Sequence, residues 1–375
     1  MGAILRILLL GLGAIALALV VPRAAGEELR VRLLWDQDLS QEMVILSNSG
    51  GWASGSAVFA VGANTLGSFA REDGSILSGA IRHRSFSQSG NYYINQAGTI
   101  ADRWAVMDGR TGSVSFHERQ GLPRLYGPVL AQFGAREILL RDSRFGGTVS
   151  LPRREALSTF DALPGGDDGE RPAFAVMGDI FGEVSLHRID LSRAAEDEAE
   201  ERYRLPSAEG PVFGVKLLPG EPPFVVVVRG LDPQVVELFR YGTAVPLLRE
   251  EVHSDNAVEE PLVFHELDQS QVMVALRDSV LLVDVHEKTL RYSTVSATGA
   301  VAATVSGERG DLLVATARDQ GLSLALWTLA GFDRPREDRR GPLTWSLPGA
   351  RLAASTENLL VLERKDRFFA FEVAP

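Results

Sequence analysis

"LVFHELDQSQVMVALRDSVLLVDVHEKTLRYSTV", residues 262–295, contains four short apolar runs separated by polar turns. The runs are Leu262–His265, Val272–Ala275, Val280–Val285 and Leu290–Val295, and their β-branched residues are typical of strands. Four antiparallel strands in a unit of about 43 residues are typical of one blade of a β-propeller. A propeller requires that the same unit recur along the chain.

A short apolar strand with a small or polar lead-in recurs eight times, at spacings of roughly 36 to 50 residues. The eight starts are GSAVFAVG (55–62), NYYINQAG (91–98), GPVLAQFG (127–134), RPAFAVMG (171–178), GPVFGVK (210–216), EPLVFHE (260–266), GAVAATVS (299–306) and GARLAAS (349–355). They predict an all-β fold, an eight-bladed β-propeller of four-stranded antiparallel blades. Seven blades is the alternative, because the pattern weakens between residues 91 and 170.

Two stretches are predicted to be loops rather than strands. Residues 151–172, LPRREALSTFDALPGGDDGERP, have the composition of an inserted loop. Residues 193–204, RAAEDEAEERYR, are charged all round and lack an apolar face, so they predict an exposed loop or one surface turn.

The two ends of the chain are predicted to share one blade. The last unit supplies only three strands, around Leu352–Ala354, Leu359–Glu363 and Phe368–Val373. The segment ELRVRLLW, residues 28–35, is a strand without a unit of its own. If it pairs with the last unit, it closes the ring and removes the sheet edges at the chain ends. Residues 27–375 are therefore predicted to form a single propeller domain.

The first 26 residues have the layout of a secretory signal. Arg6 precedes an apolar run, Ile7–Val21, and small residues follow up to Gly26. The run is shorter than the roughly 20 residues that span a bilayer comfortably. We expect a cleaved signal peptide, or alternatively an uncleaved anchor that associates the protein with the membrane. In both cases residues 27–375 are expected in the periplasm, free or anchored and facing it.

Composition excludes several classes of function. The net charge of −11 argues against a nucleic-acid partner. The chain has no cysteine, which excludes disulfides, thiolate catalysis, cysteine-ligated metals and attachment of a lipid through cysteine. An exported protein of this kind must be held together by packing and sheet closure.

The stretch AVMDGRTGSVSF, residues 105–116, suggests a resemblance. Residues 108–112 are predicted to form a tight turn between the third and fourth strands of the second unit. Decayed versions of this pattern occur at 69–78, 282–292 and 33–40. The pattern resembles the repeat of pyrroloquinoline-quinone-type propellers, over most of residues 28–375. Size and export signal are most similar to the non-enzymatic, BamB-like outer-membrane assembly scaffolds.

The resemblance implies an eight-bladed scaffold that binds other envelope proteins. Two features depart from it. BamB-like proteins are usually lipoproteins, and this chain has no cysteine to lipidate. The tryptophans do not fall at regular repeat positions; they are Trp35, Trp52, Trp104, Trp327 and Trp345.

No catalytic, cofactor-binding or metal-binding residue can be assigned from the sequence. The six histidines show no local metal-site spacing; they are His83, His117, His187, His253, His265 and His286. His265 and His286 could approach each other in the sixth unit, where a hydrogen-bonded pair is favoured over a metal site. The charged segments 165–170, 195–201 and 333–340 are predicted to be solvated loops.

The predicted function is a non-enzymatic protein-binding scaffold in the cell envelope, with no cofactor. The resemblance to BamB-like propellers implies a role in outer-membrane protein assembly. The alternative is a ligand-binding or enzymatic propeller with a site at the mouth of the central channel. A channel lined by Asp, Glu, His and Arg would favour the alternative, whereas a plugged apolar channel and an exposed hydrophobic loop patch would favour the scaffold. A surface-anchored structural protein is a third possibility.

Overall fold

The computed structural model describes most of the chain after residue 29. The described residues are 30–38, 57–61, 66–70, 72–78, 85–89, 92–95, 103–108, 113–118, 120–153, 156–166, 171–191, 201–206, 210–252, 257–258, 261–262, 264–266, 270–276, 280–293, 301–306, 311–318, 321–328, 343–356, 359–365 and 367–374. Across these ranges there is no helix with the length and hydropathy needed to cross a membrane. The predicted signal or anchor, residues 1–26, lies outside them.

The described strands form eight antiparallel sheets. Blade 1 is β2 (Ala57–Val61), β3 (Leu66–Ala70) and β4 (Ile76–Ser78); blade 2 is β5 (Ser85–Ser89), β6 (Tyr92–Asn95), β7 (Arg103–Asp108) and β8 (Val114–Glu118); blade 3 is β9 (Leu122–Tyr126), β10 (Val129–Phe133), β11 (Glu137–Asp142) and β12 (Thr148–Pro152); blade 4 is β13 (Leu157–Leu163), β14 (Ala173–Asp179), β15 (Val184–Ile189) and β16 (Glu201–Arg204). Blade 5 is β17 (Val212–Leu218), β18 (Phe224–Arg229), β19 (Val235–Arg240) and β20 (Leu248–Glu251); blade 6 is β21 (Phe264–Glu266), β22 (Gln271–Ala275), β23 (Val280–Asp284) and β24 (Thr289–Ser293); blade 7 is β25 (Val301–Ser306), β26 (Asp311–Arg318), β27 (Gly321–Thr328) and β28 (Leu343–Pro348); blade 8 is β29 (Arg351–Thr356), β30 (Leu359–Arg364), β31 (Arg367–Ala374) and β1 (Arg30–Asp38).

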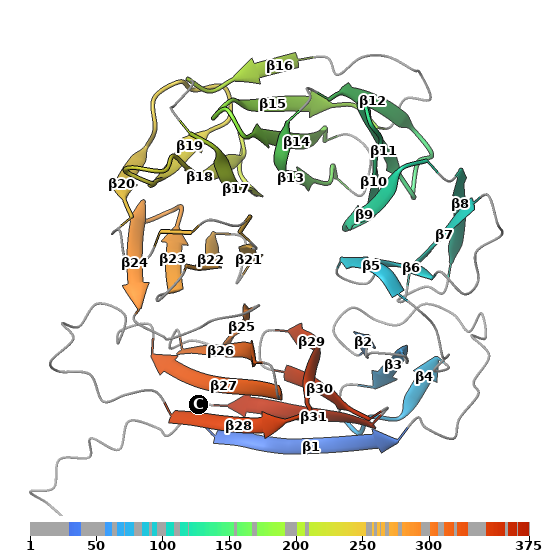
Figure 1. Cartoon of the computed structure of the whole chain (residues 1–375). Helices are drawn as coiled ribbons and strands as arrows, with labels where there is room; N and C mark the ends of the chain where they lie inside the picture. Colours follow the sequence, from blue (N-terminus) through green and yellow to red (C-terminus); the bar gives the residue numbers. More distant parts are fainter. Residues whose placement is uncertain are drawn as a thin grey trace, which may run out of the picture.

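The blades follow one another around a ring, with the first strand of each nearest the centre (Figure 1). In each blade the strands lie side by side in chain order, except that β1 is added outside β31. The predicted all-β propeller of four-stranded antiparallel blades is confirmed. Blade 1 has three strands within the described part of the chain.

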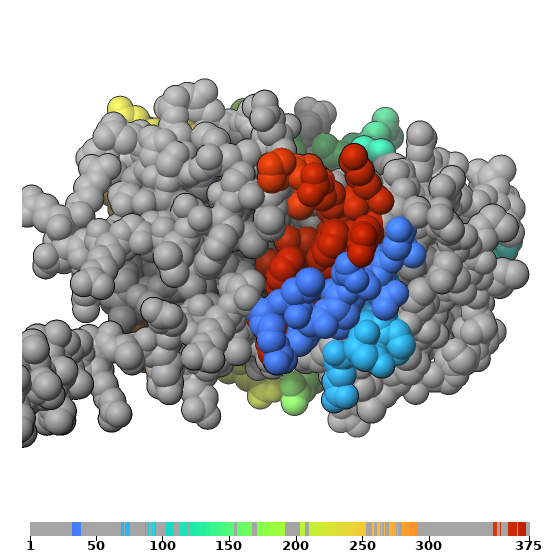
Figure 2. Space-filling view, turned by 90° about the horizontal axis from the view of Figure 1, so that it is seen from below, coloured from blue at the N-terminus to red at the C-terminus, as the bar shows by residue number. Residues whose placement is uncertain are grey.

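The N-terminal strand lies on the C-terminal strand. Paired residues run from Arg30 opposite Ala374 to Asp38 opposite Arg367. Figure 2 shows β1, in blue, against the C-terminal strands, in red. The strand predicted at residues 28–35 therefore pairs with the last unit, and it continues three residues further, to Asp38. The chain ends are thus joined by backbone hydrogen bonds in one sheet.

An aromatic cluster joins this N-terminal strand to blade 1. The Trp35 side chain is 6% exposed and its ring centroid lies 5.2 Å from that of Phe69. Phe69 in turn lies 5.4 Å from Phe368 of β31. Gly74, with φ of 71°, lies so close that a Cβ there would be 2.4 Å from the indole Cδ2. Trp35 is therefore a packing link between blades 8 and 1.

Three of the eight predicted blade starts are wrong, because they are second strands. Residues 91–98 contain β6, 127–134 contain β10, and 171–178 contain most of β14. The true first strands are β5 (SFSQS), β9 (LPRLY) and β13 (LSTFDAL), which are more polar. A middle strand has a paired strand on each side and is buried on both faces, as in the fully buried β18 (FVVVVR). Middle strands therefore form the continuous apolar runs that stand out in the sequence.

Both predicted loops contain strands. Residues 151–172 include the end of β12 and all of β13, whose central residues Phe160–Ala162 are buried. Residues 201–204, at the end of the charged stretch 193–204, form the outer strand β16. An outer strand needs little apolar surface, so its composition resembles that of a loop.

The position predicted for the turn in the 105–116 stretch, between the third and fourth strands of the second unit, is confirmed. β7 ends at Asp108 and β8 begins at Val114, and these are the third and fourth strands of blade 2. The Ser113 carbonyl accepts a 3.0 Å hydrogen bond from the Asp108 N–H. Residues 109–112 lie outside the described residues.

Neighbouring blades are also linked by side chains on their innermost strands. Ser87 Oγ of β5 accepts a 3.0 Å hydrogen bond from the Leu125 N–H of β9. Ser89 Oγ accepts a 2.8 Å bond from the Gly127 N–H just beyond that strand. These hydrogen bonds satisfy backbone donors that no neighbouring strand reaches, which explains why an inner strand can be polar.

Candidate functional site

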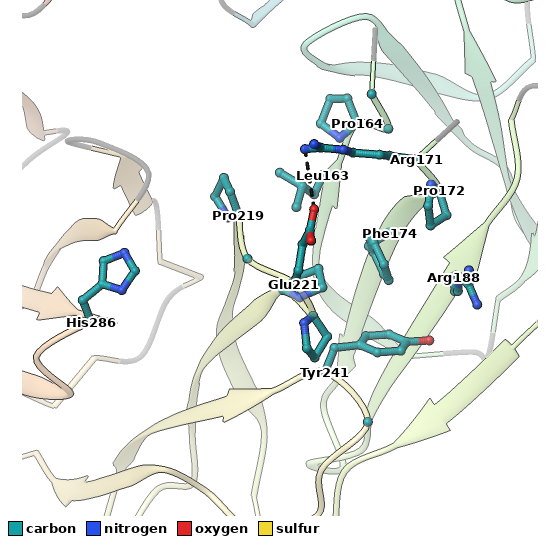
Figure 3. A pocket seen from close by; sticks show the side chains of 16 residues that line it. Leu163, Pro164, Arg171, Pro172, Phe174, Arg188, Pro219, Glu221, Tyr241 and His286 are labelled. Atoms are coloured by element: carbon teal, nitrogen blue, oxygen red, sulfur yellow. Dashed lines mark ion pairs between the residues drawn. The ribbon is translucent and has the colours of Figure 1, made fainter. Parts of the chain in front are cut away.

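An open groove of about 980 Å³ lies at one end of blades 4, 5 and 6. Its walls come from the β13–β14 and β17–β18 connections, and the turns after β19 and β23 complete it. We call it the proline groove, because five prolines line it: Pro164, Pro172, Pro219, Pro222 and Pro223. Its aromatic and charged residues are Phe174, Tyr241, Arg171, Arg188, Glu221 and His286 (Figure 3).

The proline-rich walls come from two corresponding connections. Each begins with the same three residues, Leu163-Pro164-Gly165 in blade 4 and Leu218-Pro219-Gly220 in blade 5. A proline ring fixes its own φ, so these walls lose little conformational freedom on folding. The second connection is tied down where the Pro223 carbonyl accepts a 2.8 Å hydrogen bond from the Tyr241 N–H.

The floor of the groove is aromatic. The Phe174 and Tyr241 rings, from blades 4 and 5, meet edge to face with centroids 5.0 Å apart. Edge-to-face pairs of this kind are favourable contacts between aromatic rings. The floor therefore also joins the two blades.

His286 lies across the groove from Arg171 and Arg188 (Figure 3). Its turn is held by the Asp284 side chain, whose Oδ1 accepts hydrogen bonds from the N–H groups of His286 and Glu287. The imidazole packs against the ring of Phe224, with centroids 6.4 Å apart.

The charged rim of the groove is exposed. Arg171 Nη1 lies 3.8 Å from Glu221 Oε1, with side chains 74% and 82% exposed. An ion pair in water of this kind contributes little, since solvent screens it. Arg188 is also exposed and lies on the same rim. The described rim thus carries two arginines and one glutamate, a cationic balance on a chain with net charge −11.

The innermost strands of blades 4 to 6 carry a second charged group. Lys216 Nζ of β17 lies 3.2 Å from Asp161 Oδ2 of β13 and forms a second ion pair with Glu266 of β21. Asp161 Oδ2 also accepts a 2.8 Å hydrogen bond from the Leu217 N–H. These contacts link three successive blades.

Burial and charge act against each other in this group. Burial lowers the pKa of Lys216, but the Asp161 and Glu266 carboxylates outweigh it, so the pKa is raised and the ammonium stays charged at neutral pH. Burial raises the pKa of Asp161, and Lys216 and the Leu217 N–H oppose that rise. Because the hydrogen bonds favour the carboxylate, we regard the pair as ionised. These innermost strands therefore carry charged side chains, whereas a scaffold would be favoured by a plugged apolar channel.

An exposed apolar patch lies at the opposite end of blades 4 and 5. Connections between second and third strands carry Ile180, Phe181 and Leu231, which are 51%, 70% and 61% exposed. In an antiparallel sheet these connections lie at the other end of the strands from those that line the proline groove. We call these three residues the apolar turn patch.

The buried Arg229 holds the two turns of the patch together. Its Nη1 donates hydrogen bonds to the Gly182 carbonyl at 3.3 Å and the Pro206 carbonyl at 2.6 Å. Its Nε donates to Glu237 Oε2 at 2.7 Å, and both side chains are at most 5% exposed. The patch is therefore presented on fixed turns.

Three of the six histidine side chains are described, those of His117, His187 and His286. His117 and His187 are buried, and each hydrogen-bonds to the serine two residues earlier, Ser115 at 3.0 Å and Ser185 at 3.3 Å. Because the same Ser-x-His pair recurs on two strands with the imidazole buried each time, we interpret it as structural. His265 is in β21, but its side chain, like His83 and His253, lies outside the description.

Within the described residues, no cluster of three or more His, Asp or Glu could hold a metal ion. Of the charged loops, Gly165, Gly166 and Glu201 are described; 167–170, 195–200 and 333–340 are not.

Burial of His117 makes stability depend on pH. Desolvation and the nearby Arg141 lower its pKa below the ordinary value of 6.5. The unfolded chain therefore binds more protons below pH 6.5, so the free energy of unfolding falls as pH drops through that region and is unaffected above it. Urea unfolding of wild type and His117→Gln at pH 7.5 and 5 should show a smaller fall in the variant. An equal fall would contradict the assignment.

The proline groove was missed at the sequence level. Its residues come from four connections and from strands β13, β14 and β15, spread over more than a hundred positions, and none forms a recognised motif. The available signal was the repeated Leu-Pro-Gly at 163–165 and 218–220. These two copies end first strands, whereas a third copy, at 347–349, lies at the end of the fourth strand β28, so the tripeptide alone does not identify the groove. The composition of residues 151–172 also predicts a loop and not a strand.

No family model and no curated protein matches this chain. Among solved structures, the crystal structure of BBS1N in complex with ARL6DN, soaked with mercury, is 12% identical; the match covers 76% of this chain and 87% of that one, with a TM-score of 0.46. The crystal structure of the RRP9 WD40 repeats is 13% identical; the match covers 92% of this chain and 100% of that one, with a TM-score of 0.44. At these values neither structure informs on partner or activity.

Proposed function

We propose that this chain is an exported, non-enzymatic scaffold that binds other proteins of the cell envelope. The observation that carries the proposal is the apolar turn patch. Ile180, Phe181 and Leu231 are each more than half exposed, yet they stand on turns fixed by a buried arginine. Exposed apolar residues grouped on a rigid surface are typical of protein-binding sites.

Export and envelope location rest on the sequence of residues 1–26. A charged start, a short apolar run and small residues before Glu27 favour cleavage after Gly26. A role in outer-membrane protein assembly rests on the resemblance to BamB-like propellers. N-terminal sequencing of the protein from its native host tests the first point: a mature chain that begins at Glu27 supports export, and a cytoplasmic chain that begins at Met1 contradicts it.

The competing function places a ligand or enzyme site at the centre of the ring. The charged residues on the innermost strands, Asp161, Lys216 and Glu266, are the observation in its favour. They are, however, paired with one another. A ligand there would have to break these ion pairs before it gained any contact, so we favour the scaffold.

Charge on the apolar turn patch is expected to weaken partner binding. The double variant Phe181→Asp/Leu231→Asp should lower affinity at least tenfold for the envelope protein crosslinked to the wild type, because desolvating two carboxylates opposes burial of the patch. Both side chains are exposed, so the fold should persist. Crosslinking in native envelopes followed by binding measurements with the purified partner is the test.

The matched control is Val245→Asp, since Val245 is 74% exposed but lies on the β19–β20 connection, at the other end of blade 5. It should bind like the wild type. Equal binding by the patch variant, or no specific partner recovered with the wild type, would contradict the proposal.

A further inference from the structure

We propose that the proline groove binds an extended acidic segment of a partner protein. The groove lies at the opposite end of the blades from the apolar turn patch, so it is a second surface. The inference relies on the proposed function only in that the occupant is a protein. Four features of the groove support it: its length, its rigidity, its charge and its apolar floor.

The groove has the shape for an extended chain. It runs from Arg171 in blade 4, past Pro219 in blade 5, to His286 in blade 6 (Figure 3). Compact small ligands are usually held in pockets that enclose most of their surface. An open groove of about 980 Å³ that crosses three blades instead suits several residues of extended backbone.

The groove is formed before any ligand arrives. Five prolines line it, and the Pro223 carbonyl is bonded to the Tyr241 N–H at 2.8 Å. Binding to a rigid surface avoids the entropy cost of ordering loops. An extended peptide, which gains no internal contacts on binding, needs such a preformed site.

The charge of the groove selects acidic residues. Among the described residues Arg171 pairs with Glu221 at 3.8 Å, and because both side chains are exposed, an incoming carboxylate can replace Glu221 at little cost. Arg188 adds a second exposed guanidinium on the same rim. Guanidinium groups bind carboxylates with two hydrogen bonds. The described part of the rim is therefore cationic, although the chain as a whole carries −11.

Between the charges, the groove offers apolar contact. The ring of Phe174 lies on the floor next to Tyr241, 5.0 Å between centroids, with prolines on both sides. The expected ligand therefore has acidic residues flanking an apolar residue or proline.

Selection from a phage-displayed library of random twelve-residue peptides tests the proposal on the full chain. We expect wild type to enrich peptides with net negative charge. In fluorescence anisotropy a synthetic copy of the leading peptide should bind Arg171→Glu/Arg188→Glu at least tenfold more weakly than wild type. Affinity should also fall as salt is raised, since the rim is exposed.

The control is Arg136→Glu, which makes the Arg→Glu change once, on an exposed residue of the β10–β11 turn, at the end of the blades opposite to the groove. It should retain wild-type affinity. Asp167→Asn/Asp168→Asn, in the connection next to Arg171, should not weaken binding; weakening would mean that these acids hold the ligand and would overturn the proposal.

The proposal would also be overturned by peptides that are basic, by peptides that bind the groove variant as well as wild type, or by no enrichment at all. So would a site that binds free succinate through the two arginines but none of the peptides. Each of these results leaves the apolar turn patch and its partner unaffected, so failure of this proposal is distinguishable from failure of the scaffold function.

Discussion

Replacing Trp35 by alanine is expected to lower the free energy of unfolding by about 3–5 kcal/mol, the usual cost of removing a large buried aromatic side chain. The indole is 6% exposed and packs on Phe69, which itself contacts Phe368. Trp35 thus links the N-terminal strand, the C-terminal strand and blade 1. Without it, β1 keeps its backbone hydrogen bonds to β31 but loses its packing against the next blade.

Equilibrium urea unfolding of Trp35→Ala and Leu33→Ala measures this effect. Leu33 is on the same strand but 50% exposed, so its truncation should cost no more than about 0.5 kcal/mol. Equal losses in the two variants would contradict the role of Trp35. Limited proteolysis provides a second readout, because a loosened N-terminal strand should be released earlier in Trp35→Ala than in the control.

Replacing Arg229 by methionine is expected to cost about 3–5 kcal/mol, because it leaves a buried carboxylate without its main partner. Glu237 is 4% exposed, and the guanidinium of Arg249, 3.7 Å away, would be its remaining ion pair. The carbonyls of Gly182 and Pro206 would also lose a donor. Thermal and urea unfolding measure the loss.

The double variant Arg229→Met/Glu237→Leu separates charge from packing. It removes both buried charges, so it should recover a large part of the lost stability. It does not restore the bonds that hold the turns of Ile180–Phe181 and Leu231 together, so partner affinity at the apolar turn patch should stay lower than in the wild type. A double variant no more stable than Arg229→Met would contradict the buried-charge explanation.

The two proposed binding surfaces use the same two blades. The apolar turn patch stands on connections between second and third strands of blades 4 and 5, whereas the proline groove lies at the first-to-second connections of those blades. Arg229 fixes one end and the proline-rich walls fix the other. A scaffold built in this way can hold two partner segments at a constant separation, because the strands between them are rigid and buried.

The propeller itself could be predicted from the sequence because its middle strands are buried on both faces. Continuous apolar runs such as FVVVV at 224–228 and VLLVD at 280–284 stand out from their surroundings and recur at a regular period. The same reasoning failed for the first strands of blades 2 to 4. Ser87 and Asp161 are polar residues on innermost strands, and what stabilises them is a hydrogen bond to the next blade, which no local pattern reveals.

The all-β repeat and the pairing of the N-terminal strand with the last unit follow from the order of residues alone, because strand propensity and burial act locally and leave a period in the chain. Only the tertiary structure decided which strand of each unit is innermost and which connections meet at the groove and the patch. Arg171 and His286 line the same groove because the curvature of the ring places blades 4 to 6 side by side, and the turns of Ile180 and Leu231 are linked through Arg229. That curvature arises from packing between blades, and spacing along the chain carries no record of it.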